Sequence, residues 1–221
     1  MAGLAERRKE MLDEFTRGAI YEAAVNVLTQ HGLGGATMDR VASEAGIAKG
    51  SLYKYFRTKR ALLEFVHNRA IEPLQKRLSE LVDQPLPAVE KLRQIVRHWR
   101  EHLVQNRPVF EFLVNDRAVQ SLVRDSEMTA RALAVHQIAS IISQGIQQGA
   151  FRSVDPRLVA DMFIGAAIGM VEHEFSSGRV REVDEATNSL IDIFVNGLMA
   201  RGGTTVLPSA RERGGTQLPG E

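Results

Sequence analysis

The sequence predicts an all-α fold in which a helix-turn-helix lies near the N-terminus and a longer helical part follows it. Apolar residues recur every three or four positions along most of the chain, which is the spacing of one face of an α-helix. No segment alternates apolar and polar residues as a half-exposed strand would. Glycines, prolines and capping Asp or Thr residues separate the periodic segments and mark where each helix begins and ends.

Length and composition are those of a globular protein. The formal net charge is only +1 over 221 residues, so any affinity for nucleic acid must come from local clusters of charge. The lack of cysteine excludes disulfides, thiolate metal sites and cysteine nucleophiles. The start of the chain has no hydrophobic signal core, and no apolar run approaches the ~20 residues of a membrane span. We therefore expect a cytoplasmic protein that does not enter a membrane.

The first helix is predicted from Arg17 to Gly32. Residues 1–16 alternate charges with apolar side chains, which predicts either a frayed arm or an extension of this helix. Gly32 ends the helix, and the following glycines form a loop that leads to Thr37. The apolar stripe of the helix consists of Ile20, Ala23, Ala24, Val27 and Leu28.

The segment 37–56 predicts a helix, a tight turn and a short second helix. Thr37 is the N-cap of the first of these helices, and Gly46 supplies the positive φ that a turn needs. Leu52 and Phe56 form the apolar side of the second helix. Its other side is small, basic and aromatic, and carries Lys49, Gly50, Ser51, Tyr53, Lys54 and Tyr55.

Charge is distributed unevenly just after the turn. The stretch from Gly46 to Arg60 contains five basic residues and no acid. Thr58 is a predicted N-cap, so Lys59 and Arg60 fall in the first turn of the next helix, where cations face the positive end of the helix dipole. A bound anion such as phosphate would remove this conflict. A solvated basic face is the alternative, but the helix-turn-helix spacing and the interleaved tyrosines favour an anion site.

These residues carry a resemblance to a known family. The segment 20–66 resembles the DNA-binding domain of the tetracycline-repressor (TetR) family of bacterial transcription regulators. The matching features are the pair Ala23 and Ala24, His31–Gly32, Thr37–Ala42, Ala45–Phe56 and Lys59–Leu62. The remainder of the chain resembles the family in layout alone.

We expect the chain to have four parts, and the resemblance implies a set of DNA contacts. The parts are an arm over 1–16, a DNA-binding domain over 17–60 whose motif spans 37–56, an effector-binding and dimerisation domain over 61–201, and a disordered tail over 202–221. Phosphate contacts fall to Thr37, Ser51, Tyr55 and Lys59, although Tyr55 has a partly buried position as an alternative. Lys49 is expected to bind a guanine edge, Gly50 lets the backbone approach the bases, and further readout falls to Tyr53, Lys54 and Arg40.

The rest of the chain predicts further helices. One should run from Thr58 to about Leu81, with Pro73 inside it as a kink or a break. The punctuation DQPLP over 83–87 precedes a helix over 88–106, and Pro108 opens another segment. Later boundaries are predicted at Asp125, the cap of a long helix that Gly149 ends, at Asp155–Pro156, which opens a helix to about Phe175, and at Asp184, which opens a last helix to about Arg201.

The family's layout also implies a dimer and an effector pocket. Its last two helices form a four-helix bundle with a second copy, and here they carry Gly165, Gly169, Leu190 and Phe194. Two mid-helix glycines cost about 1 kcal/mol each relative to alanine, and close approach of a partner helix would offset this; an internal neighbour is the alternative. The candidate pocket residues, for which a plain core position is the alternative, are Trp99, His102, Phe110, Phe112, Leu113, Arg117, His136, Met162, Phe163 and His173.

Two other functions compete with this reading. His98, Glu101 and His102 match the H-x-x-E-H pattern of zinc hydrolases, although no other feature indicates a hydrolase. A constitutive DNA-binding protein without an effector would instead have no cavity among its middle helices. The hypothesis we favour is a homodimeric, ligand-responsive repressor that binds a near-palindromic DNA operator and needs no metal or cofactor.

Overall fold

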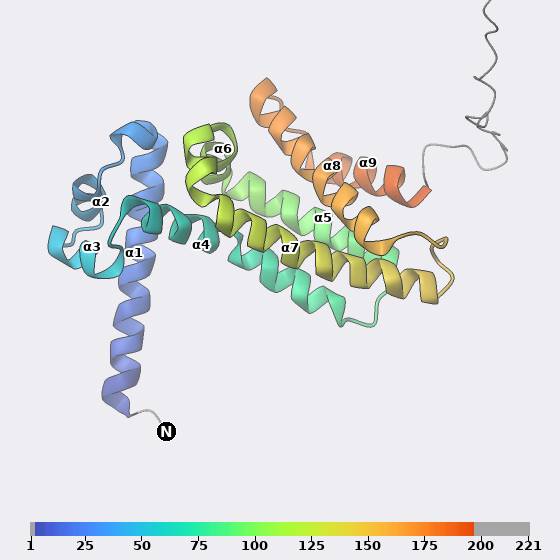
Figure 1. Cartoon of the computed structure of the whole chain (residues 1–221), viewed down its shortest axis with the longest axis horizontal. Coiled ribbons are helices and arrows are strands. Elements are labelled where there is room, and N and C mark those ends of the chain that lie inside the picture. Colours follow the sequence, from blue (N-terminus) through green and yellow to red (C-terminus); the bar gives the residue numbers. More distant parts are fainter. Residues whose placement is uncertain (1–2, 197–221) are drawn as a thin grey trace, which may run out of the picture.

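The computed structural model describes residues 3–196, which form nine helices and no strand. Figure 1 shows α1, α2 and α3 at one end of the molecule, while α4 leads from them into a bundle with α5, α7, α8 and α9. The bounds are α1 Leu4–Gly35, α2 Met38–Glu44, α3 Lys49–Tyr55, α4 Lys59–Val82, α5 Ala88–Gln105, α6 Arg107–Asn115, α7 Arg117–Gln147, α8 Pro156–Ser177 and α9 Val183–Asn196. The all-α prediction is confirmed.

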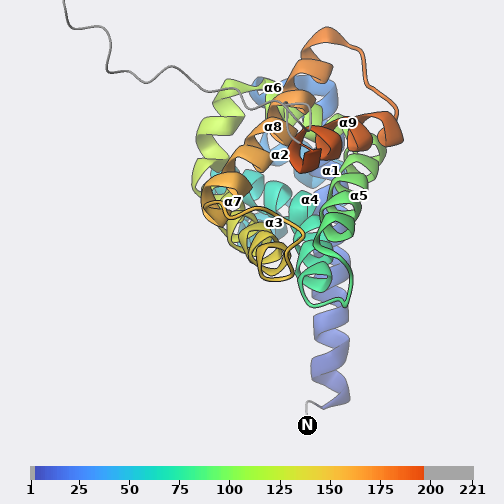
Figure 2. The ribbon, with the colours of Figure 1, turned by 90° about the vertical axis from the view of Figure 1, so that its right-hand side faces the viewer.

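The first helix is longer than its apolar stripe requires. The predicted stripe, from Ile20 to Leu28, is the buried face of α1. The helix nevertheless continues back to Leu4, and Figure 2 shows these first turns projecting away from the rest of the molecule. At the other end, Gly32 has φ 62° and ψ −176°, so the regular helix stops there as predicted.

Local caps fix the ends of α2, α3 and α4. The Thr37 hydroxyl accepts a hydrogen bond from the Arg40 N–H, and the Thr58 hydroxyl accepts one from the Ala61 N–H. Gly46 has φ 65°, which turns the chain between α2 and α3. These predictions are confirmed.

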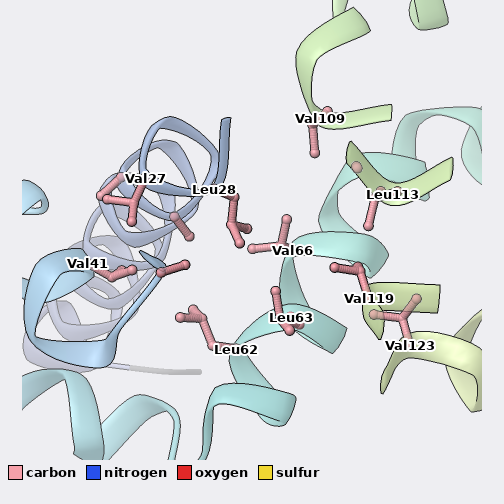
Figure 3. Packing of buried hydrophobic residues seen from close by; sticks show 14 of the residues in the cluster. Val27, Leu28, Val41, Leu62, Leu63, Val66, Val109, Leu113, Val119 and Val123 are labelled. Atoms are coloured by element: carbon pink, nitrogen blue, oxygen red, sulfur yellow. The ribbon is translucent and has the colours of Figure 1, made fainter. Parts of the chain in front are cut away.

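Two clusters of buried apolar side chains form the core. The first joins α1, α2 and α3 to the start of α4 and continues to α6, the start of α7 and the end of α8. Figure 3 shows part of it, with Leu62, Leu63 and Val66 of α4 between Leu28 of α1 and Val119 of α7. The second joins the end of α4 to α5, α7, α8 and α9. Helix α4 therefore contributes to both clusters.

Pro73 does not divide α4. The helix runs from Lys59 to Val82 as one element with Pro73 inside it, so of the two predicted outcomes, a kink or a break, the break is wrong. Pro73 is exposed, so water can bond the carbonyl that loses its partner, and buried Ala70 and Leu78 on either side hold the helix against the core.

The long helix α7 begins earlier than predicted. Its N-cap is Asp116, whose carboxylate accepts hydrogen bonds from the N–H groups of Ala118 at 2.9 Å and Val119 at 3.2 Å. Asp125 lies inside the helix and forms an ion pair with Arg60 at 2.7 Å, so its predicted capping role is wrong. The stronger local signal was Asp116, because it bonds two free N–H groups at once.

The last two helices begin as predicted. The Asp155 carboxylate caps α8 ahead of Pro156, and Gly178, with φ 70°, ends it. Helix α9 starts at Val183, while its predicted end near Arg201 and the predicted tail over 202–221 lie outside the described residues. Within 3–196, no helix is long and apolar enough to cross a membrane.

Candidate nucleic-acid interface

Helix α3 is held by two buried side chains and presents the rest of its residues to solvent. Leu52 is fully buried and Phe56, which ends the helix, is 5% exposed. The exposed residues of the helix are Lys49, Gly50, Tyr53 and Lys54, while Ser51 and Tyr55 are half-buried. The exposed surface of α3 is therefore cationic and aromatic, and the first core cluster anchors the opposite side of the helix.

Lys49, the first residue of α3, forms an ion pair with Asp39 of α2. The Lys49 Nζ lies 2.7 Å from Asp39 Oδ1 and 2.8 Å from Oδ2, and both side chains are largely exposed. The hydrogen bond to Asp39 raises the pKa of Lys49, which favours the charged form of its ammonium group. The segment from Gly46 to Arg60 contains no acid, so its charge alone did not predict this carboxylate, which comes from the preceding helix.

Tyr55 links α3 to α1. The guanidinium carbon of Arg17 lies 5.3 Å from the centre of the Tyr55 ring and 5.9 Å from that of Phe56, so Arg17 makes a cation–π contact with both. Arg17 also donates to Asp13 at 2.9 Å, and this bond lowers the pKa of Asp13. The Tyr55 ring is thus part of the packing between the two helices.

Two other predicted contacts hold the loop between α1 and α2. The Arg40 guanidinium donates to the Gly35 carbonyl at 2.8 Å. The Lys59 ammonium, which is half-buried, donates to the Leu33 carbonyl, and burial lowers the pKa of Lys59. Thr37 is exposed, with its hydroxyl engaged as the cap of α2. Arg40 and Lys59 therefore fasten the end of α1 to α2 and α4.

The remaining cations of this region differ in how they are paired. Arg60 forms ion pairs with Glu64 at 2.8 Å and with Asp125 at 2.7 Å. Within residues 3–196, Lys54 and Arg57 are both exposed and form no ion pair. Lys54 and Arg57 are consequently the cations of this region that are most available to bind an anion.

A separate cavity of about 220 Å³ lies among α4, α5, α7 and α8. Its walls are mostly apolar, and its polar lining residues include His67, His98, Arg77, Glu127 and Arg131. Burial lowers the pKa of both histidines, and neighbouring Arg77 adds to this effect at His98. The apolar lining consists of Ile71, Leu74, Leu78, Ile95, Val96, Trp99, Ala130, Ala134, Ile138, Phe163, Ile164, Ala167 and Ile168.

The structure brings only two of the predicted pocket residues, Trp99 and Phe163, to this cavity. The side chains of His136, Met162 and His173 point to solvent. Phe110 and Leu113 are buried in the first core cluster, and Phe112 and Arg117 line an open hollow between α1 and α6. The lining residues that were not predicted include Leu74 and Leu78 of α4.

His98 and His102 do not converge on a common site. His102 Nε2 lies 2.8 Å from the Ala70 carbonyl oxygen, and its Nδ1 lies 3.3 Å from the Asn106 amide nitrogen. His98 lines the cavity instead. Over the described part of the chain, no three His, Asp or Glu side chains are grouped as a metal site would require.

The predicted dimer residues differ in whether they face solvent or the core. Gly165 and Gly169 are exposed on α8. A Cβ at Gly169 would meet nothing within 4 Å, and one at Gly165 only the Arg131 guanidinium at 3.9 Å. Leu190 is buried, and the ring of Phe194 packs edge-on against Phe163 with the centroids 5.1 Å apart. Leu190 and Phe194 thus pack inside the subunit.

Comparison with known proteins places both parts of the chain in one family. Residues 20–66 match the bacterial regulatory proteins of the tetR family, and residues 85–198 match the tetracyclin repressor-like C-terminal domain. A fatty acid metabolism regulator protein of Bacillus subtilis is 23% identical over 192 residues, which span 81% of this chain and 93% of that protein.

Two solved structures share the fold. The regulator FadR from Bacillus subtilis, in complex with stearoyl-CoA, has a TM-score of 0.71 at 21% identity and covers 82% of this chain and 98% of its own. The complex of SmeT with triclosan has a TM-score of 0.72 at 18% identity, with coverages of 93% and 99%. Proteins of the matched family are regulators of transcription and not enzymes, so the hydrolase alternative is dropped. The chain belongs to the TetR family and is a DNA-binding regulator of transcription.

Proposed function

We propose that the protein is a ligand-responsive repressor that binds a near-palindromic operator as a homodimer. The observation that carries this proposal is the outward face of α3, where Lys49, Gly50, Tyr53 and Lys54 are exposed on a helix anchored in the core. The major groove admits such a helix, and its base edges offer a distinct pattern of donors and acceptors for each base pair.

In this proposal the predicted DNA contacts divide into two groups. The exposed side chains of Thr37, Tyr53 and Lys54 meet phosphates or base edges directly. Arg40 and Lys59 contribute mainly through their hydrogen bonds to the Gly35 and Leu33 carbonyls. These bonds set the angle at which α2 and α3 approach the duplex. Phosphate contacts set affinity and its dependence on salt, whereas base contacts set specificity.

The homodimer is proposed to form through the outer face of α8. This face repeats small and apolar side chains at helical spacing and carries Leu158, Met162, Gly165, Ala166 and Gly169, all exposed. Among residues 3–196, no contact requires glycine at 165 or 169, so the cost of two helical glycines favours a close approach by a second copy of α8. Two-fold packing there presents two copies of α3 to one duplex.

The effector is proposed to be an amphipathic small molecule with a hydrocarbon part. The cavity among α4, α5, α7 and α8 is lined mainly by aliphatic and aromatic side chains, and its polar groups are few. The stearoyl-CoA in the similar FadR structure joins a long hydrocarbon chain to a charged coenzyme A group, and the triclosan in the SmeT structure is mainly aromatic, so both ligands carry an apolar part that such a cavity could take.

Helix α4 provides the route from this cavity to the DNA-binding helices. Its first half carries Leu62, Leu63 and Val66 in the core with α1 and α2, and its second half lines the cavity with Ile71 and Leu74. An effector that binds better to one position of α4 than to another shifts the population of the two. The spacing of the two α3 helices then changes, and the operator is released.

The experiment begins with selection of genomic DNA fragments by the purified protein. Fluorescence anisotropy on a selected fragment then follows release by long-chain acyl-CoA, with free coenzyme A as the control ligand. We expect the acyl-CoA alone to release the fragment, and Ala134→Trp, which fills the cavity, to bind DNA without responding. Failure to enrich any sequence would contradict the DNA-reading role; enrichment without any ligand response would instead indicate a constitutive regulator.

A further inference from the structure

The ion pair between α2 and α3 places a donor and an acceptor side by side on the exposed face of the helix-turn-helix. Lys49 Nζ and Asp39 Oδ1 are 2.7 Å apart, and their side chains are 59% and 62% exposed. Both residues stand in the first turn of their helices, since α2 begins at Met38 and α3 at Lys49. The pair therefore joins the N-terminal ends of α2 and α3, on the surface that is proposed to enter the groove.

The spacing of this pair matches the edge of one base pair. In the major groove, guanine offers the acceptors O6 and N7, and cytosine offers the N4 amino group as a donor. Guanine O6 and cytosine N4 are joined by a Watson–Crick hydrogen bond, so they lie about 2.9 Å apart, as ordinary N–H···O partners do. A lysine nitrogen and a carboxylate oxygen at 2.7 Å can thus face O6 and N4 at the same time. The thymine O4 and adenine N6 of a T·A pair are joined in the same way, but guanine offers the ammonium a second acceptor, N7, where thymine carries its methyl group, and this favours G·C.

We propose that Asp39 is a specificity-determining residue that, together with Lys49, reads a single G·C pair in each half-site. The Lys49 ammonium donates to both guanine O6 and N7, and the Asp39 carboxylate accepts from the cytosine N4 amino group. This inference rests on the proposed role of α3 in reading DNA. It adds a base contact from α2, and it assigns the class of base pair that the two residues recognise.

Charge explains why an acid is tolerated in this position. A lone carboxylate near the phosphates would be repelled by the duplex, but Lys49 neutralises Asp39 at hydrogen-bonding distance. Helix α2 has a second acid, Glu44, which serves a different purpose. Its carboxylate accepts a hydrogen bond from the Asn26 side chain of α1 at 3.4 Å and so helps to pack α1 on α2. Because an exposed ion pair is weak, turning it toward a base pair costs little.

A purely structural role for Asp39 makes a different prediction. An acid in the first turn of a helix favours the positive end of its dipole, so Asp39 also stabilises α2. Loss of that contribution would weaken binding to every sequence alike and would leave base preferences unchanged. The two roles are therefore separated by sequence preference, and not by affinity alone.

The test is selection from a randomised duplex library with the wild-type chain, Asp39→Asn, Lys49→Gln and the control Asp83→Asn. Asp83 is an exposed acid in the turn after α4, at the end of that helix away from α3, so its loss changes net charge equally. Thermal unfolding followed by circular dichroism, measured on each variant, checks that all are folded at the assay temperature.

We expect the wild type and Asp83→Asn to select a G·C pair at one symmetric position in each half-site. Asp39→Asn and Lys49→Gln should both relax that same position, with discrimination against A·T falling by about tenfold or more. An Asp39→Asn variant that keeps every base preference, or that relaxes a different position from Lys49→Gln, overturns the inference. A wild type that selects no sequence contradicts the proposed function itself, which keeps the two failures distinct.

Discussion

Lys49 and Lys54 are both exposed cations of α3, but their surroundings differ. Lys49 is neutralised by Asp39, whereas Lys54 forms no ion pair within residues 3–196. An unpaired surface lysine attracts any phosphate, while a lysine whose charge a neighbouring carboxylate neutralises gains mainly where a base edge offers it further acceptors. The two residues should therefore contribute differently to affinity and to specificity.

Lys49→Ala is expected to weaken operator binding by roughly 5- to 100-fold and to weaken random-DNA binding much less, because it removes a base contact. Lys54→Ala, the matched control, should weaken both alike and reduce the salt slope by about one unit. Anisotropy titrations with operator and random duplexes over a salt series measure both effects. Equal losses from the two substitutions on both duplexes would refute this division of roles.

His67 makes stability depend on pH. The imidazole is buried at the cavity wall, and burial lowers its pKa below the ordinary 6.5, although Glu127 and a bond to Asn68 act in the opposite direction. The folded protein then binds fewer protons than the unfolded chain as pH falls below 6.5, so the free energy of unfolding decreases on acidification.

His67→Leu is accordingly expected to flatten the loss of stability between pH 7.5 and 5.5, because the group that titrates differently in the two states is gone. Urea unfolding midpoints at the two pH values measure it. His136→Leu on the exposed face of α7 serves as the control and should leave the pH dependence as in the wild type. An unchanged slope in His67→Leu would show that His67 does not carry the effect.

At the scale of elements, a buried ion pair joins α5 to α8. Arg100 and Glu174 are each 1% exposed, with Arg100 Nη2 at 2.8 Å from Glu174 Oε2, and the same nitrogen donates to the Arg181 carbonyl at 3.1 Å. Arg181 also pairs with Glu174 at 3.3 Å. This arrangement ties the helix that carries Trp99 to the helix proposed for dimerisation.

Glu174→Gln should lower the free energy of unfolding by about 3–5 kcal/mol, because it leaves the Arg100 charge buried without its counter-ion. The double variant Arg100→Met with Glu174→Leu should recover most of the loss, since neither charge then remains inside. Urea unfolding measures both. A Glu174→Gln variant as stable as the wild type would contradict the view that this pair is tightly buried.

The elements were largely predictable from the sequence, and the cavity was not. Caps such as Thr37, Thr58 and Asp155 depend on hydrogen bonds to residues two or three positions away, so the local sequence determines them. Which face of α7 or α8 borders the cavity depends on how four helices pack, and this placed Met162 and His136 in solvent. The Asp39–Lys49 pair was missed because its partners belong to different helices.

At the scale of the whole molecule, α4 is the element shared by the two ends. It packs against α1 through Leu62 and Leu63 and reaches the cavity with Leu74 and Leu78. A rearrangement of the cavity wall that moves α4 therefore also affects the DNA-binding helices, unless α4 bends. Pro73 lies between these two halves and removes one backbone hydrogen bond there.

Gly169→Leu is expected to convert a dimer into a folded monomer with weak operator binding, because a bulky side chain on the outer face of α8 blocks the close approach of a second copy. Inside the subunit the substitution meets open space, so the monomer should stay folded. Light scattering after size exclusion measures the mass. Gly18→Leu on α1, where a Cβ also meets nothing within 4 Å, should leave the oligomeric state unchanged; a dimeric Gly169→Leu would place the interface elsewhere.

The most direct test of the whole account is a hydroxyl-radical footprint of the purified protein on a selected operator. If a dimer presents two copies of α3 to the duplex, the footprint should contain two equal, symmetry-related protected half-sites. Their centres should be separated by about one DNA turn, 34–36 Å, or by a multiple of that distance. Lys49→Ala at the same protein concentration should lose both half-sites together. Protection without two-fold symmetry, or a footprint that Lys49→Ala leaves intact, would contradict the claim that α3 reads the duplex as a pair.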